Sequence, residues 1–240
     1  MLGSLLDRVF VACTNRKGEL PLQVEHYSFF KKDSNDDPDI NWVCFVPEFC
    51  YHVSFIRKRI VSEGANMDIY VLPRTAVQPN PQLTCRYLNS VFKTAIRNQA
   101  RLYSGKEVNV LGISMGNVLA FRFAEHFQVN KLVSVVPGSR LAECIWESIA
   151  TNPIAESSGK DLQDYKRSLA GYNPIEWCSS INPRSSEIHL GTCDLMIPTE
   201  RGKELAEVMQ RRFETDVKYH RFSGHLDTIL SFSKHFHKMI

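Results

Sequence analysis

The sequence predicts an α/β domain built on a largely parallel β-sheet flanked by helices. Short apolar runs that are typical of strands buried on both faces alternate along the chain with longer segments of helical periodicity. Strands separated by helices return to the sheet through right-handed crossovers, which make neighbouring strands parallel. The length of 240 residues fits one domain of this class. We therefore expect a single domain over residues 1–240.

The predicted strands share a high content of β-branched and aliphatic residues and are bounded by Gly, Pro or charged turns. The clearest is the apolar run WVCFVP, which has the composition of a fully buried strand. The predicted strands cover residues 20–30, 42–47, 67–73, 107–113, 131–138, 186–192 and 217–222.

Helical periodicity fills most of the intervals between these strands. The predicted helices cover residues 53–63, the stretch after RTAVQPNPQ up to about Tyr103, 118–127, 199–213 and the segment after residue 225. Residues 141–185 break the alternation, because the short helices AECIWESIA and LQDYKRSLA are separated there by the Pro-containing linkers TNPIAESSG, GYNPIEW and INPRS. We expect this stretch to form a small helical cap, inserted after the strand at 131–138.

Composition and charge exclude several classes of function. The chain has 29 basic and 26 acidic residues, a balance that favours neither nucleic acid nor an anionic membrane surface. The seven cysteines are an odd number without a C-x-x-C motif, which indicates free, buried thiols in a reducing compartment. The N-terminus lacks the pattern of a signal peptide, and the chain has no apolar run of about 18 residues that could cross a membrane. We expect a cytoplasmic protein without integral membrane association.

A serine flanked by glycines stands between a predicted strand and a predicted helix, in the sequence Gly112-Ile113-Ser114-Met115-Gly116. On such a sharp turn the glycines leave room where a Cβ would strike the strand and helix, and the serine hydroxyl is held out at the carboxyl end of the sheet. The following helix points its free N–H groups at the same place. Ser114 is therefore a candidate nucleophile.

A serine hydroxyl needs a base, so this hypothesis requires an acid and then a histidine after later strands. Asp194 follows the strand at 186–192, and His225 follows the strand at 217–222 just before the last helix. The competing acids are Asp227, Glu200 and Glu143, but Asp227 lies only two residues from His225 and is better placed to cap the helix, and Asp194 fits better. The sequence shows no phosphate-binding Gly-rich loop and no metal-ligand spacing, so we expect neither a cofactor nor a metal.

With GISMG at 112–116, GTCDLMIP at 191–198 and SGH at 223–225 in this order, the chain resembles the α/β-hydrolase superfamily from about residue 20 to its end. The resemblance implies a sheet of about eight strands, Ser114 as nucleophile, His225 as proton carrier and Asp194 as its orienting acid. It also implies that the backbone N–H of Met115 contributes to an oxyanion hole. By alignment the second donor is Phe49.

The chain departs from the family pattern at this second donor, because Pro47-Glu48-Phe49 stands where members commonly carry His-Gly before the oxyanion residue. A glycine is missing, and a carboxylate stands close to where negative charge develops. If the Glu48 side chain pointed into the site it would oppose catalysis, whereas a Glu48 side chain in solvent would leave the site intact.

The leading functional prediction is a serine hydrolase that cleaves a small or medium acyl ester or thioester through an acyl-enzyme. Its partner is then a small-molecule acyl substrate, and the aromatic side chains of Tyr51, Trp146 and Trp177 are candidates for the substrate pocket. Two alternatives stay open. The same triad could transfer the acyl group to an alcohol or amine, with Arg57, Lys58 and Arg59 facing an anionic acyl carrier. Alternatively, the fold could be a catalytically silent binding protein.

Overall fold

The computed structural model describes residues 7–8, 23–30, 41–52, 58, 61, 65–102 and 106–236. The predicted helix over 53–63 lies outside these residues apart from two positions. Cys13, Arg57 and Arg59 also lie outside them, as do the first residues of the strand predicted over 20–30.

The described strands form one seven-stranded sheet in the order β1-β3-β2-β4-β5-β6-β7. Only β1 runs antiparallel to its neighbour, and it sits at the edge beside β3. All other neighbours are parallel, as the alternation of strands and helices predicts. The strands are β1 (Glu25–Phe29), β2 (Asn41–Pro47), β3 (Asn66–Leu72), β4 (Asn109–Ile113), β5 (Lys131–Val135), β6 (Ser185–Gly191) and β7 (Thr215–His220).

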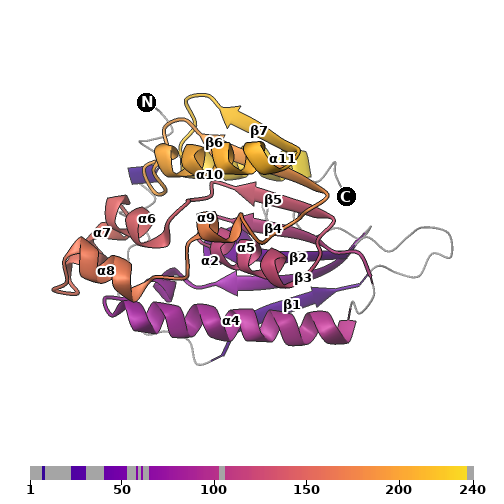
Figure 1. The fold of residues 1–240 in the computed structure, drawn as a ribbon, viewed down its shortest axis with the longest axis horizontal. Helices are drawn as coiled ribbons and strands as arrows, with labels where there is room; N and C mark the ends of the chain where they lie inside the picture. The colour runs from indigo at the N-terminus through magenta and orange to yellow at the C-terminus, as the bar shows by residue number, and fades with distance from the viewer. Residues whose placement is uncertain are drawn as a thin grey trace.

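Helices cover both faces of this sheet and also extend beyond one end of it (Figure 1). The longest described helix is α4, with 22 residues, and none of the described helices combines the length and apolar character needed to cross a bilayer. The helices are α2 (Glu48–His52), the 3-10 turn η1 (Arg74–Ala76), α4 (Pro81–Leu102), α5 (Gly116–His126), α6 (Leu141–Glu147), α7 (Asn152–Glu156), α8 (Leu162–Ser168), α9 (Pro174–Trp177), α10 (Thr199–Arg212) and α11 (His225–Phe236).

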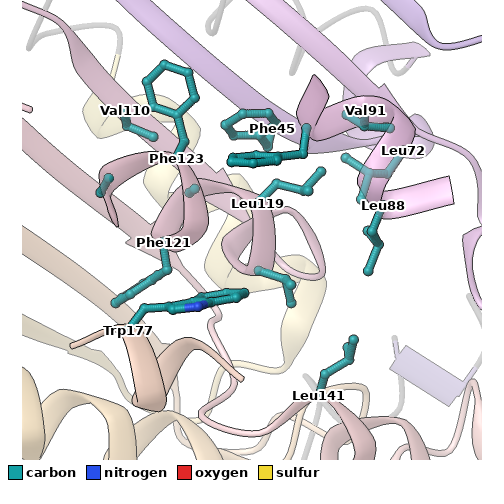
Figure 2. Close-up of a cluster of buried hydrophobic side chains, with 14 of the residues drawn as sticks. Phe45, Leu72, Leu88, Val91, Val110, Leu119, Phe121, Phe123, Leu141 and Trp177 are labelled. Atoms are coloured by element: carbon teal, nitrogen blue, oxygen red, sulfur yellow. The ribbon is translucent and has the colours of Figure 1, made fainter. Parts of the chain in front are cut away.

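One core cluster joins a face of the sheet to α4, α5 and α10. Figure 2 shows how α5 serves both sides of this cluster: Phe123 points toward Phe45 and Val110 of the sheet, and Phe121 points toward Trp177 of α9. These aromatic side chains are almost completely removed from water. Burial of large apolar side chains on two sides of one helix fixes α5, and with it the turn that precedes α5, relative to β2 and β4.

The opposite face of the sheet is covered by α11, whose residues Ile229, Phe232 and Phe236 pack against Trp42 and neighbouring side chains of the central strands. The ring of Phe236 meets Trp42 edge-on, with ring centroids 4.9 Å apart. Because His225 is the first residue of α11, this packing also fixes the direction from which His225 enters the site.

The structure corrects the predicted boundaries at several turns. β5 ends at Val135 and not at residue 138, because Val136 takes a positive φ of 45° and Pro137 has no N–H for the ladder. β7 ends at His220 and not at residue 222, because the chain turns at Phe222, which has a φ of 57°. Val136 thus leaves the extended conformation one residue after its strand, and Phe222 two residues after its strand.

Two of the predicted linkers contain short helices. Pro153 lies at the start of α7 and Pro174 at the start of α9, where a missing N–H costs no hydrogen bond and the fixed φ suits the first turn. Likewise, the stretch after β2 is not an open loop but the short helix α2, which contains Phe49 and Tyr51. The sequence predicts linkers at Pro153 and Pro174, whereas in the structure each of these prolines begins a short helix.

The helices α6, α7 and α8 lie beyond the carboxyl ends of the parallel strands, on the left of Figure 1. They belong to residues 141–185, which follow β5. In parallel sheets the carboxyl ends of the strands form the edge at which ligands bind. This arrangement brings α6 next to the turn that carries Ser114.

The six cysteines in the described part of the chain are free thiols, and Cys44, Cys50, Cys144 and Cys178 are buried. Burial raises the pKa of Cys144 and of Cys178 to about 12. These two thiols are therefore uncharged near neutral pH and behave as small apolar side chains.

A buried network of charged and imidazole groups lies between β6, β7 and α11. The Glu187 carboxylate contacts Lys131 and Lys218, with N–O distances of 3.0 and 2.5 Å, and the His189 ring at 2.7 Å. Burial alone would raise the pKa of Glu187, but hydrogen bonds from His189, Lys218 and Lys131 outweigh it and hold that pKa below its usual range. The other ring nitrogen of His189 lies 3.0 Å from Nε2 of His220, so the two imidazoles continue the network.

Both imidazoles titrate below their usual pKa. Burial lowers the pKa of His189 more than its Glu187 partner raises it. Burial, together with the charges of His189, Lys218 and His235, lowers the pKa of His220 to about 4. The folded state therefore holds these rings neutral at pH values where the unfolded chain already binds protons on them.

The contribution of His189 and His220 to the free energy of unfolding should fall as the pH decreases from the unfolded histidine pKa of about 6.5 toward 4, because only the unfolded state then gains these protons. Urea denaturation at pH 7.5, 6 and 5 measures this loss. The variant His220→Gln removes one of the two titrating rings, and we expect it to lose less stability over the same interval than the parent chain. Equal losses in both proteins would contradict the assignment.

Candidate active site

The turn between β4 and α5 places Ser114 at the carboxyl end of the sheet with a φ of 55°. Non-glycine residues rarely adopt this left-handed conformation. The flanking glycines are required by space. A Cβ on Gly116 would overlap the carbonyl oxygen of Phe45, and one on Gly112 would lie 2.7 Å from Oδ1 of Asn117. The predicted reason for the Gly-x-Ser-x-Gly spacing is thus present in the structure.

Hydrogen bonds from Asn117 and from β5 hold this turn. The backbone N–H of Ser114 donates to the carbonyl of Val135 at 2.9 Å. The Asn117 amide nitrogen donates to the Ser114 carbonyl at 2.9 Å and to the Val135 carbonyl at 3.0 Å. Sequence reasoning missed Asn117, although a polar residue directly before the apolar run Val118–Phe121, in the first turn of the helix, was a usable signal.

The structure brings together the three side chains that the sequence singled out. Nε2 of His225 lies 2.9 Å from Oγ of Ser114, and Nδ1 of His225 lies 2.8 Å from Oδ2 of Asp194. Since a carboxylate only accepts, Nδ1–H donates to Asp194, and Nε2 is left to accept the Ser114 hydroxyl proton. The imidazole therefore has the tautomer that a general base for this serine needs.

Asp194 is fixed in place by the turn that follows β6. Its Oδ1 accepts the backbone N–H groups of Met196 and Ile197, both at 2.8 Å. Its second oxygen is then free to face His225. The turns that carry the acid and the histidine are also joined directly, because the N–H of Cys193 donates to the carbonyl of Ser223 at 3.0 Å. Asp194 and His225 are both buried.

Burial of the His225 ring opposes its protonation, but the charge of Asp194, the hydrogen bond to Asp194 and the charge of Asp7 outweigh burial. The pKa of His225 is therefore raised above its usual value. Such an imidazole is a stronger base toward the serine hydroxyl than an unpaired histidine at the same depth. Asp7 was not a candidate in the sequence, where 218 residues separate it from His225.

The competing acids do not meet His225 in this way. Glu143 pairs with Lys166 at 3.1 Å in the α6–α8 region. Glu200 is largely exposed and pairs with Lys203 at 2.7 Å. Asp227 stands in the first turn of α11. The geometry favours Asp194 as the partner of His225.

The two residues expected to supply oxyanion donors occupy different environments. Met115 directly follows Ser114 and precedes the first residue of α5, so its backbone N–H belongs to the end of the helix nearest the serine. Phe49 is buried in α2, directly after β2. The carboxylate of Glu48 accepts the backbone N–H of Arg74 at 3.0 Å. Glu48 is therefore engaged with the chain after β3, in an exposed contact.

A pocket of about 90 Å³ opens beside Ser114. Its walls come from the turn after β4, the end of η1, the region of α6 and the turn after Asp194, and they are mostly apolar. The lining residues are Val77, Ser114, Met115, Leu141, Cys144, Ile145, Ser148, Ala150, Thr151, Met196 and Ile197.

Tyr51, Trp146 and Trp177, the expected substrate residues, do not line this pocket. Tyr51 is buried in α2 and stacks on Tyr27 with ring centroids 4.3 Å apart. Trp177 belongs to the core around α5, and Trp146 packs against Tyr165. The large apolar surfaces of these three side chains are used in packing. The pocket wall consists mostly of aliphatic, Met and Cys side chains, and none of the lining residues is aromatic.

No group of three or more His, Cys, Asp and Glu side chains among the described residues is arranged to hold a metal ion.

Comparisons with known proteins agree with this architecture. No family model matches the chain, and no curated protein matches its sequence. Among solved structures, Est1E from Butyrivibrio proteoclasticus superposes with a TM-score of 0.62 at 10% identity, covering 90% of this chain and 92% of its own. MGS-M2, an α/β hydrolase from a Medee basin deep-sea metagenome library, gives a TM-score of 0.54 at 12% identity over 89% of this chain and 92% of its own.

The chain has the α/β-hydrolase fold. The Pyrococcus horikoshii acylaminoacyl peptidase shares this fold with a TM-score of 0.61 at 11% identity over 92% of this chain. Our chain spans 39% of the length of that peptidase. At identities of 10–12% the likeness establishes the α/β-hydrolase fold alone. Any conclusion about the reaction therefore rests on the side chains of this chain.

The contact between Gly116 and the β2 backbone should make Gly116→Ala strongly destabilising. The added methyl group would overlap the carbonyl oxygen of Phe45, which cannot move without breaking hydrogen bonds of the sheet. We therefore expect the free energy of unfolding to fall by about 3 kcal/mol or more. Urea denaturation measures it. In the control Gly202→Ala the new methyl meets the tip of the Leu190 side chain at 2.5 Å and lies 3.1 Å from the carbonyl oxygen of Pro137. We expect a smaller loss there than from the backbone overlap at Gly116. A larger loss in the control would refute this interpretation.

Proposed function

We propose that this protein is a serine hydrolase that cleaves a small acyl ester or thioester through an acyl-enzyme. The observation that carries the proposal is the continuous hydrogen-bonded chain from Ser114 Oγ through the His225 ring to Asp194. This arrangement turns a weakly nucleophilic hydroxyl into an attacking group. The Pyrococcus furiosus esterase Pf2001, which superposes with a TM-score of 0.58 at 14% identity, has the same fold and supports the proposal.

In the proposed first half-reaction Nε2 of His225 takes the proton of the Ser114 hydroxyl while Oγ bonds to the acyl carbon. The protonated imidazole is stabilised by Asp194 through the 2.8 Å contact to Nδ1. It then returns the proton to the leaving alkoxide or thiolate as the bond to the acyl carbon breaks. The products of this half-reaction are an alcohol or thiol and an ester of Ser114.

In the second half-reaction a water molecule takes the place of the leaving group. His225 removes its proton, the hydroxide bonds to the acyl carbon, and the proton returns to Ser114 Oγ as the ester bond breaks. The carbonyl oxygen carries negative charge in both steps. We propose that the backbone N–H of Met115 stabilises it at the start of α5, with Phe49 of α2 as the second donor.

The size of the pocket supports a short acyl group. A volume of about 90 Å³ is well below the roughly 300–1,000 Å³ of pockets for drug-sized ligands. Leu141, Ile145 and Met196 contribute apolar wall, which suits an acyl chain and not a charged group. Since several wall residues come from 141–185, we propose that this stretch caps the acyl site.

The variant Ser114→Ala should lose hydrolysis of p-nitrophenyl acetate by roughly 10⁴-fold or more, because no other group replaces the nucleophile. The assay is run on the acetate, butyrate and octanoate esters together with a thermal melt, which should be close to that of the parent chain. The control Ser90→Ala removes an exposed hydroxyl on α4 and should keep full activity. Equal activity of Ser114→Ala and the parent would refute the proposal, and inactivity of both would favour the silent binding protein.

Shortening a wall residue should move the preference toward longer acyl chains. Met196 is only partly buried, so Met196→Ala widens the pocket at little cost to the core, while its backbone N–H still donates to Asp194. We expect the ratio of kcat/KM for octanoate to that for acetate to rise in this variant. The control Met209→Ala shortens a methionine of α10 that lies in the core, outside the pocket wall, and should leave the ratio unchanged. An unchanged ratio in Met196→Ala would exclude this pocket as the acyl site.

A further inference from the structure

A single buried carboxylate contacts both turns that carry the candidate triad. Asp7 has no exposed surface. Its Oδ2 accepts the backbone N–H of His225 at 3.0 Å and that of Leu195 at 3.3 Å. Its Oδ1 accepts the backbone N–H of Leu226 at 3.3 Å.

Two of these N–H groups belong to the N-terminal end of a helix. His225 and Leu226 are the first residues of α11, and the first N–H groups of a helix have no partner within it. The residues just before the helix do not supply one, since the Ser223 hydroxyl contacts the carbonyl of Arg221. Asp7 therefore takes the place of a capping residue from a distant part of the chain. The positive end of the helix dipole also favours an anion there.

The third N–H group, that of Leu195, links the start of α11 to the turn that carries Asp194. Leu195 directly follows Asp194, so the Asp7 carboxylate spans the turn after β6 and the start of α11 at once. The distance between those two backbone segments sets the distance between the Asp194 carboxylate and the His225 ring. Rearrangement of either segment would lengthen the 2.8 Å contact that orients the imidazole.

We propose that Asp7 is a positioning residue of the triad, whose carboxylate holds the backbones of His225 and Leu195 together so that His225 and Asp194 stay in register. This inference rests on the proposed hydrolase function. Asp7 is not among the residues that line the pocket, and its hydrogen bonds come from backbone N–H groups of the two turns, so it acts through these turns and through its charge.

The charge of Asp7 should affect the pKa of His225, and a purely structural role of Asp7 would not have this effect. The charged groups that act on the His225 ring are Asp194 and Asp7, and both raise its pKa. The pKa of Asp7 is itself raised, chiefly by burial, which the His225 N–H and the nearby imidazole oppose. Loss of the Asp7 charge should therefore lower the pKa of His225. Because hydrolysis needs neutral His225, the acid limb of the pH–rate profile should move to lower pH.

The test compares Asp7→Asn with the parent chain and with Asp216→Asn, which removes an exposed carboxylate on β7. In Asp7→Asn we expect kcat for p-nitrophenyl acetate to fall roughly 10- to 100-fold, since a small displacement of reacting groups has this effect. KM should change little, and the acid limb should shift downward. Asp216→Asn should keep the parental kcat and profile. Parental kcat and profile in Asp7→Asn would overturn the proposal.

A second variant covers the case in which Asp7→Asn does not fold. Asp7→Ser is smaller and keeps one hydroxyl oxygen near the helix end, but it lacks the charge. Circular dichroism confirms which variant is folded, and the same fall in kcat and the same shift of the acid limb are expected for it. A folded Asp7→Ser with the parental profile would equally overturn the proposal.

A separate readout keeps this inference distinct from the proposed function. If the parent chain shows no Ser114-dependent hydrolysis, the hydrolase proposal fails, and the role of Asp7 is then judged by NMR titration of the His225 imidazole nitrogens. A lower His225 pKa in Asp7→Asn than in the parent, with Asp216→Asn unchanged, would support the positioning role. Identical titrations in all three proteins would overturn it.

Discussion

The site depends first on the close approach of α5 to the backbone of β2. Gly116 has no side chain because the carbonyl of Phe45 occupies that space, and Phe45 itself packs against Phe123, which lies about two turns further along α5. This contact leaves the chain only a very short path from β4 into α5. Ser114 must then turn through a left-handed conformation with its side chain projecting outward. The strain at one residue is held by the burial of many apolar side chains around α5.

The charge on the His225 side of the site is also set by buried groups that interact with one another. His225 would be a weak base if burial acted alone, and the two carboxylates of Asp194 and Asp7 reverse that effect on its pKa. Each carboxylate is stabilised in turn by backbone N–H groups, from Met196 and Ile197 for Asp194 and from the start of α11 for Asp7. At Asp7 the N–H donors of His225 and Leu226 oppose the rise in pKa that burial causes.

Much of the fold and of the candidate site could be predicted because the signals were local. The alternation of apolar strands and periodic helices predicted the parallel sheet, and the spacing of glycines around Ser114 predicted the turn. The position of β1 at an antiparallel edge depends on pairing with β3, which no local pattern encodes. Strand ends were set by single residues such as Val136, whose positive φ is unusual for a β-branched side chain.

The pocket wall and the role of Asp7 could not be predicted from the sequence, because both depend on contacts between segments that lie far apart along the chain. Aromatic residues drew attention as substrate contacts, but Trp177 is used in the core and the wall is made from Leu141, Ile145 and Met196, which look like ordinary core residues in sequence. Asp7 meets His225 across 218 positions of the chain. Contacts of this kind arise only when the sheet and α11 have brought distant segments together.

The most direct test of the central claim is covalent labelling of the folded chain with a fluorophosphonate, followed by peptide mass spectrometry. The account predicts one equivalent of label on Ser114 and a labelling rate that rises as His225 loses its proton with increasing pH. Absence of label from Ser114 in a chain that is folded by circular dichroism, or label spread over several other serines, would contradict it.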